Sequence, residues 1–267
     1  MSNKAQQARA EIQAMDTLAV MDSPMHRFSP LSKLLLIVLY IVIVVSFPKY
    51  AFTGLFIMFL FPVFWYQLAG IPIRTCFHKL RVVMPLVCAV GLLNPFFDRQ
   101  ILWQFPHFGV SGGVVSMCTL AMKGVFSLMA SFILVATTPI DELCRAFRQL
   151  HFPKIITSLL LLTFRYVSVL LDEVAIMTEA YHLRAPGQKG IHISAWGSFL
   201  GQLILRSMDR AESLYDSMLL RGFHGEFHYS THTRSSRYSW IFFLVSSALI
   251  LLMRWINLTQ LIGSLFI

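Results

Sequence analysis

The stretch AESLYDSMLLRGF, residues 211–223, combines apolar and charged side chains at helical spacing and ends in Arg-Gly-Phe. The apolar stripe begins further upstream, and its members recur at alternating steps of four and three: Ile204, Met208, Ala211, Tyr215 and Met218. This spacing predicts an amphipathic helix over about Trp196–Arg221. Gly222 then stands where a glycine commonly ends a helix. We therefore expect a long helix that presents one apolar face and stops at an arginine.

This helix belongs to a charged segment, residues 139–237, which holds half of the 22 Lys and Arg and most of the 13 Asp and Glu. A shorter helix is expected at its start, with Thr138 as the cap and Pro139 in the first helical position, running to about Leu150. A second helix should cover Lys154–Leu183. The stretch APGQKG, residues 185–190, breaks that second helix.

Arg184 and Arg221 are thus each expected at the end of a long helix. One interpretation is that an arginine in a last turn only complements the helix dipole. The other is that two exposed guanidinium groups are docking elements, because arginine makes oriented, bidentate contacts with carboxylates and carbonyls. Helix physics leaves both interpretations open.

The remainder of the chain is strongly apolar. The mean hydropathy is +0.65, and only 13% of the residues are charged, against about 25% in a soluble domain. Five apolar runs are long enough to be expected to cross a membrane: Leu31–Phe47, Tyr50–Leu68, Val82–Phe97, Val114–Thr137 and Tyr238–Ile256. The third run is the weakest, because it is short and carries prolines. The fold class is therefore an all-α, polytopic membrane protein with about five spans.

Lysine and arginine are dense before the first run and between the second and third, and sparse in the alternate loops. The positive-inside rule then places the N-terminus in the cytoplasm. The expected organisation is a cytoplasmic N-terminal segment (1–30), four spans (31–138), a cytoplasmic helical region (139–237), and a last span with the C-terminus (238–267). The apolar run Ile155–Leu171 is a possible sixth span, but Arg165 within it favours a helix along the membrane interface.

The expected spans lack the groups that intramembrane chemistry needs. Lys123 is the one clear charge within a span, and we interpret it as a packed or snorkelling side chain. No phosphate-binding loop and no Gly-x-Ser-x-Gly motif occur, the four cysteines show no metal-site spacing, and no basic aromatic platform indicates nucleic-acid binding. We therefore expect neither a catalytic residue nor a bound metal or cofactor in this chain.

The order of motifs resembles a known family. Thr138-Pro139-x-Asp141-Glu142-Leu143 is followed by Phe164-Arg165-Tyr166, by Asp172-Glu173, and by the Ala211–Phe223 stretch. This series is similar to the transmembrane T component of energy-coupling-factor transporters, in the CbiQ-type branch that serves cobalt or nickel uptake. The similarity runs from about Met25 to Glu226.

The resemblance implies a bacterial inner-membrane subunit that ties a substrate-binding membrane subunit to two cytoplasmic ATP-binding-cassette ATPases, which hold the ATP and Mg²⁺. It implies that two coupling helices end in Arg-Gly docking motifs, at Arg221-Gly222 and at Arg184. Ala185 departs from the usual glycine at the first tip, so that helix is expected to end differently. The apolar helix faces would press on the substrate-binding subunit and on membrane lipid.

Two alternatives stay open. His224, His228 and His232 recur every four residues and would share a face if helical, although the neighbouring residues favour a loop. The other alternative is a self-contained channel, secondary transporter or membrane enzyme, which would need polar residues along a path or ligands on span faces.

Overall fold

The computed structural model describes residues 2–19, 23, 25, 28–49, 52–71, 81, 84–85, 87–92, 101–104, 109–188, 190–225 and 237–255. The chain forms two compact units, and each combines segments that are distant in sequence. The first unit joins Met1–Ala19 to Pro139–His232, and the second joins Val20–Thr138 to Thr233–Ile267.

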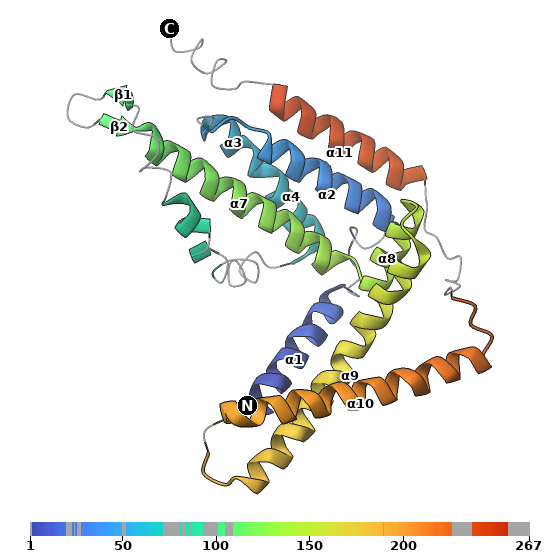
Figure 1. Ribbon diagram of the computed structural model, residues 1–267. Helices are drawn as coiled ribbons and strands as arrows, with labels where there is room; N and C mark the ends of the chain where they lie inside the picture. Colours follow the sequence, from blue (N-terminus) through green and yellow to red (C-terminus); the bar gives the residue numbers. More distant parts are fainter. Residues whose placement is uncertain are drawn as a thin grey trace. The chain divides into compact units, whose positions relative to one another are not determined.

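The second unit is a bundle of apolar helices in which α2 lies between α7 and α11 (Figure 1). Its helices are α2 (Pro30–Val45), α3 (Phe52–Met58), α4 (Leu60–Ala69), α7 (Gly112–Thr137) and α11 (Arg237–Trp255). A short antiparallel hairpin of β1 (Ile101–Gln104) and β2 (Gly109–Ser111) precedes α7. The expected all-α class is confirmed, and this hairpin is a small addition to it.

The second expected span is interrupted between α3 and α4, and its sequence gives the reason. Pro62 lacks the N–H that would donate to the carbonyl of Met58 four residues earlier. The buried Tyr40 hydroxyl of α2 donates to this carbonyl instead, at 2.9 Å. Tyr66 of α4 similarly donates to the Met129 carbonyl of α7, at 3.2 Å. Tyrosine hydroxyls therefore tie the helices together while satisfying backbone groups in the apolar core.

Three of the described helices are long and apolar enough to cross a membrane, namely α7, α9 (Lys154–Arg184) and α11. Helix α2 and the stretch Gly54–Ala69 are apolar but shorter. Most of the expected third span lies outside the described residues. Its described part contacts α7 closely, because a Cβ added at Gly124 would lie 2.9 Å from Val87. Helix α9 meets the length and composition of the possible sixth span.

The first unit consists of α1 (Ser2–Ala19), α8 (Ile140–Gln149), α9 and α10 (Ile193–Leu220). Helices α1 and α8 pack on α9, and α10 crosses it (Figure 1). The bounds of α9 are within one residue of the expected ones, and α10 begins three residues earlier than expected.

The expected cap of α8 is wrong in detail. Pro139 occupies the cap position itself, and no side chain caps the helix. The Thr138 hydroxyl is buried and makes no hydrogen bond in the described part of the chain. Backbone donors of Glu142 and Leu143 bond to the Pro139 carbonyl, both at 3.0 Å, so the turn closes without Thr138.

Candidate functional site

Helices α9 and α10 form a crossed pair that is held by ionic contacts near its middle. Glu173 of α9 forms ion pairs with Arg206 and Arg210 of α10, the second at 3.8 Å. The Glu173 side chain is largely buried, with 15% exposed, while the arginines are about half exposed. The contact fixes which turn of α10 lies against which turn of α9. Both helix ends that carry the candidate arginines belong to this pair.

The second tip has the geometry expected from its Arg-Gly sequence. Arg221 is the residue that caps α10, and Gly222 adopts a left-handed φ of 79°. The backbone N–H of Phe223 then donates to the Met218 carbonyl at 3.0 Å, and that of Gly222 to the Leu219 carbonyl at 2.9 Å. These bonds satisfy the last carbonyls of the helix. The predicted role of Gly222 in ending the helix is confirmed.

The first tip ends differently, as Ala185 led us to expect. Arg184 is the last residue of α9 and is exposed. Ala185 has a negative φ of −129°, and the left-handed turn occurs instead at Gly187, with φ of 92°. The Tyr181 hydroxyl holds the loop, because it donates to Gln188 at 2.9 Å and accepts from the His192 N–H at 3.3 Å.

The predicted apolar stripe of α10 faces away from α9. Ile204, Met208 and Tyr215 expose 58%, 57% and 53% of their surface, and Ala211 is also exposed. Met218 is half-buried, because the stripe drifts toward α9 at its end. Leu203, Ser207 and Leu214, which lie beside the stripe on the helix surface, are half-buried. The stripe is therefore an uncovered apolar surface within this unit.

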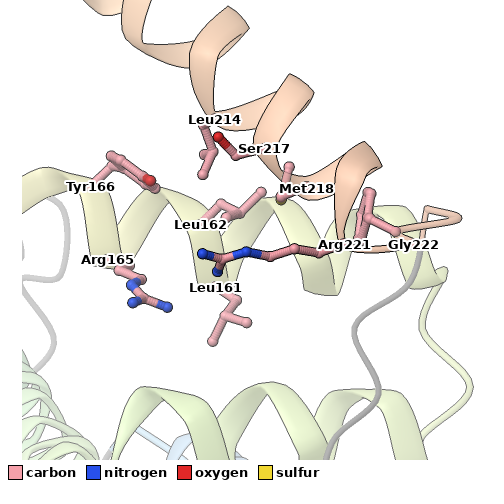
Figure 2. Close-up of a pocket in the computed structure, with 10 residues that line it drawn as sticks. Leu161, Leu162, Arg165, Tyr166, Leu214, Ser217, Met218, Arg221 and Gly222 are labelled. Atoms are coloured by element: carbon pink, nitrogen blue, oxygen red, sulfur yellow. The ribbon is translucent and has the colours of Figure 1, made fainter.

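A groove of about 550 Å³ opens where the end of α10 and the first half of α9 diverge. Its apolar surface comes from Leu161 and Leu162 of α9 and from Leu214 and Met218 of α10. Arg165 and Arg221 line the same groove, and Figure 2 shows the Arg221 side chain directed back toward Leu161 and Leu162. The sequence had marked Arg165 as an unusual charge in an apolar helix, but no pattern indicated that it shares a groove with Arg221.

The other sequence candidates do not line this groove. His224 is described and exposed, whereas His228 and His232 lie outside the described residues. No group of three or more metal-ligating side chains occurs among the residues that the structure describes. Lys123 donates to the carbonyls of Val45 and Phe47, at 3.1 and 2.5 Å, which confirms that it is a packed side chain.

In the first unit, one side chain of α1 and one of α8 have a raised pKa. Partial desolvation raises the pKa of the Asp16 carboxyl in α1, and the nearby carboxylate of Asp141 in α8 raises it further. Burial also raises the pKa of the Cys144 thiol, again with a contribution from Asp141. A buried thiol with a raised pKa is unreactive, so Cys144 is a packing residue of α8.

Sequence comparisons show that the chain is similar to a family of transport proteins. The profile of the cobalt transport protein family, CbiQ, matches residues 21–233. The energy-coupling factor transporter transmembrane protein EcfT of Limosilactobacillus fermentum is 24% identical over 220 residues, which cover 76% of this chain and 80% of the relative.

Two further relatives carry metal names. The nickel permease LarQ of Lactiplantibacillus plantarum is 30% identical over 135 residues, which cover 51% of this chain and 49% of the relative. The cobalt transport protein CbiQ of Salmonella typhimurium is 26% identical over 122 residues, which cover 43% of this chain and 52% of the relative. The match thus spans about half the length of these two relatives. Because the family profile covers most of the chain, the protein belongs to the CbiQ family of cobalt transport proteins, the membrane-embedded T components of energy-coupling-factor transporters.

Proposed function

We propose that this chain is the coupling subunit of an ATP-driven importer of cobalt or nickel ions in a bacterial inner membrane, with its N-terminus in the cytoplasm. Its partners are two cytoplasmic ATPases of the ATP-binding-cassette type and a substrate-binding membrane subunit. ATP and Mg²⁺ stay on the ATPases. This chain binds no cofactor and catalyses no reaction, and the metal ion is cargo selected by the substrate-binding subunit.

The observation that carries the proposal is the exposed arginine at the end of each long helix. Arg184 and Arg221 are exposed, and neither guanidinium has an ionic partner within the described part of the chain. An arginine held at a rigid helix end can enter a groove of another subunit and bind a carboxylate or carbonyl in a fixed direction. Closure of the ATPase pair would then bring the two helix ends together.

The second half of the mechanism uses the stripe of α10. An exposed apolar surface of this kind marks a contact with another protein or with membrane lipid. We assign it to the substrate-binding subunit, because Ile204, Met208 and Tyr215 lie on the helix that ends in Arg221. A displacement of the helix end is thereby transmitted along α10 to its apolar face. Methionine adapts its packing to a moving surface, which suits Met208 and Met218.

The test is to express the chain with its three partner subunits and to measure ATPase co-purification and metal uptake for two variants. Arg221→Ala should weaken ATPase capture by about tenfold or more, because a charge-assisted contact contributes about 1.5–3 kcal/mol. Met208→Ser should leave ATPase capture unchanged and lower uptake. Asp209→Asn is the matched control, because Asp209 follows Met208 in the sequence but lies off the apolar stripe. It should change neither ATPase capture nor uptake.

Normal complex yield together with normal uptake in Arg221→Ala would refute the docking role. Metal uptake by the chain reconstituted without partners would refute the coupling role altogether and would favour a self-contained transporter. Equal loss of uptake in Met208→Ser and Asp209→Asn would remove the argument for the stripe.

A further inference from the structure

The groove between α9 and α10 carries two positive charges without a counterion. Arg165 and Arg221 line it, and no acidic side chain is among its described lining residues. Neither guanidinium makes an ion pair with any residue that the structure describes. The contrast with the middle of the same helical pair is clear, because Glu173 there neutralises Arg206 and Arg210. Both side chains are exposed, so the two guanidinium groups are open to an anionic ligand that enters the groove.

A hydroxyl group adds hydrogen-bonding capacity beside the arginines. Tyr166 of α9 and Ser217 of α10 also line the groove (Figure 2). The Ser217 hydroxyl already donates to the Ser213 carbonyl of its own helix, at 2.7 Å, so the Tyr166 hydroxyl is the one that can donate to a ligand. A phosphate group can accept several hydrogen bonds at once, from guanidinium and from hydroxyl donors. A groove with this donor set therefore fits a phosphate ester better than a single carboxylate.

An apolar track leads out of the groove along α9. Ile155, Leu159, Leu162 and Tyr166 follow one another at steps of four, three and four, so they lie on one face of the helix. Ile155 and Leu159 expose 70% and 58% of their surface. Only 6% of the apolar window of α9 is buried inside the structure, although that window is apolar enough for a membrane. The two arginines of the groove therefore lie next to an exposed apolar surface on α9.

We infer that this groove binds the headgroup of an anionic phospholipid. The phosphate lies between Arg165 and Arg221, and the acyl chains cover Ile155 and Leu159. Basic pockets between helices at a membrane surface recognise anionic lipids in this way. An acidic segment of a water-soluble partner would neutralise the arginines but would leave the apolar track uncovered, and for this reason the lipid is favoured over a protein ligand.

The inference goes beyond the proposed coupling function and can be separated from it. Arg221 takes part in both, so a lipid in the groove would hold the same side chain that we assign to ATPase docking. Arg165 lies within α9, away from both helix ends, and is assigned to the groove alone. Variants of Arg165 therefore report on the lipid, and variants of Arg221 report on both.

The experiment measures lipid binding to the purified full-length chain in mixed micelles by native mass spectrometry. Phosphatidylglycerol is titrated beside phosphatidylcholine with the same acyl chains, and inorganic phosphate is added as a competitor. Arg165→Gln should weaken phosphatidylglycerol binding by about tenfold, equal to about 1.4 kcal/mol, and leave phosphatidylcholine binding unchanged. Arg165→Lys, which keeps the charge, should restore most of the affinity. Arg237→Gln, an exposed arginine at the start of α11, removes the same charge elsewhere and should have no effect.

Two results would overturn the inference. The first is equal phosphatidylglycerol affinity in Arg165→Gln and the unaltered chain; a loss of ATPase capture in the same variant would then assign the groove to a protein partner. The second is displacement of the lipid by low millimolar inorganic phosphate, which would make the groove a site for free phosphate.

Discussion

The left-handed backbone at Gly222 determines how α10 ends. Its φ is 79°, and a Cβ built at this position would meet no atom within 4 Å. A side chain at this position would therefore lower stability through strain in the left-handed backbone and not through a steric clash with its surroundings. We predict that Gly222→Ala lowers the free energy of unfolding by about 1–2 kcal/mol, as expected for an L-residue in this conformation. Chemical or thermal unfolding of the purified protein measures the effect.

Two glycines within α10 provide the comparison. Gly197 and Gly201 lie within the helix, and a Cβ at either would also meet open space. Because alanine is the better helix former, Gly197→Ala and Gly201→Ala should each raise stability by about 0.5–1 kcal/mol. If all three variants changed stability in the same direction, the left-handed turn at Gly222 would not be what ends the helix.

The C-terminal end of α2 shows how a half-buried charge in a membrane bundle can be structural. The last carbonyls of a helix have no partner within it. Lys123 of α7 donates to two of the carbonyls in this region, and Arg254 of α11 donates to the Ile43 carbonyl at 3.4 Å and to the Ser46 hydroxyl at 3.1 Å. Cations also complement the negative end of the helix dipole. Helices α7 and α11 are thereby both tied to one end of α2.

We predict that Lys123→Met destabilises the bundle by about 1–3 kcal/mol, because it leaves partly buried carbonyls without a donor. Lys123→Arg keeps the charge and donor capacity and should retain most of the stability. The free energy of unfolding in detergent is the measurement. A methionine variant as stable as the unaltered chain would show that water or lipid headgroups satisfy these carbonyls.

Across the molecule, the features that could be predicted from sequence are those caused by residues within about one helical turn. Pro153 sets the start of α9, the Ala185–Gly190 break sets its end, and Gly222 sets the end of α10. Each of these signals acts within one turn of the helix, and each of these helix ends lies within one residue of its expected position. The interruption between α3 and α4 has an equally local cause in Pro62, which the hydropathy of the run conceals.

Features that join distant segments could not be predicted in this way. The groove exists because α9 and α10 diverge beyond the Glu173 contact, and no spacing within either helix encodes a crossing angle. Likewise, α1 is mostly polar, and its packing on α9 brings residues together that are more than 150 positions apart. Arg9 and Asp172 form an ion pair across this contact. Only the folded chain reveals that the N-terminal helix belongs to the unit that contains both candidate tips.

The attachment of α1 leads to a prediction about how this unit is held together. Both side chains of the Arg9–Asp172 pair are 43% exposed, and such a surface pair contributes about 0.2–1 kcal/mol. The ion pair alone is too weak to hold a helix of 18 residues in place, so packing along α9 must supply most of the attachment. We predict that deletion of residues 2–19 speeds amide hydrogen exchange in the middle of α9 by more than about tenfold. Arg9→Ala should speed it by no more than about fivefold.

Amide exchange in α11 provides the internal reference, because α11 belongs to the other unit and should be unaffected by either change. A double-mutant cycle of Arg9→Ala with Asp172→Ala should give a coupling energy of about 0.2–1 kcal/mol. If Arg9→Ala matched the deletion, the ion pair would be the main attachment and not packing. If the deletion left exchange in α9 unchanged, α1 would contribute nothing to the stability of the α9–α10 pair, and α9 would be rigid through its contacts with α8 and α10 alone.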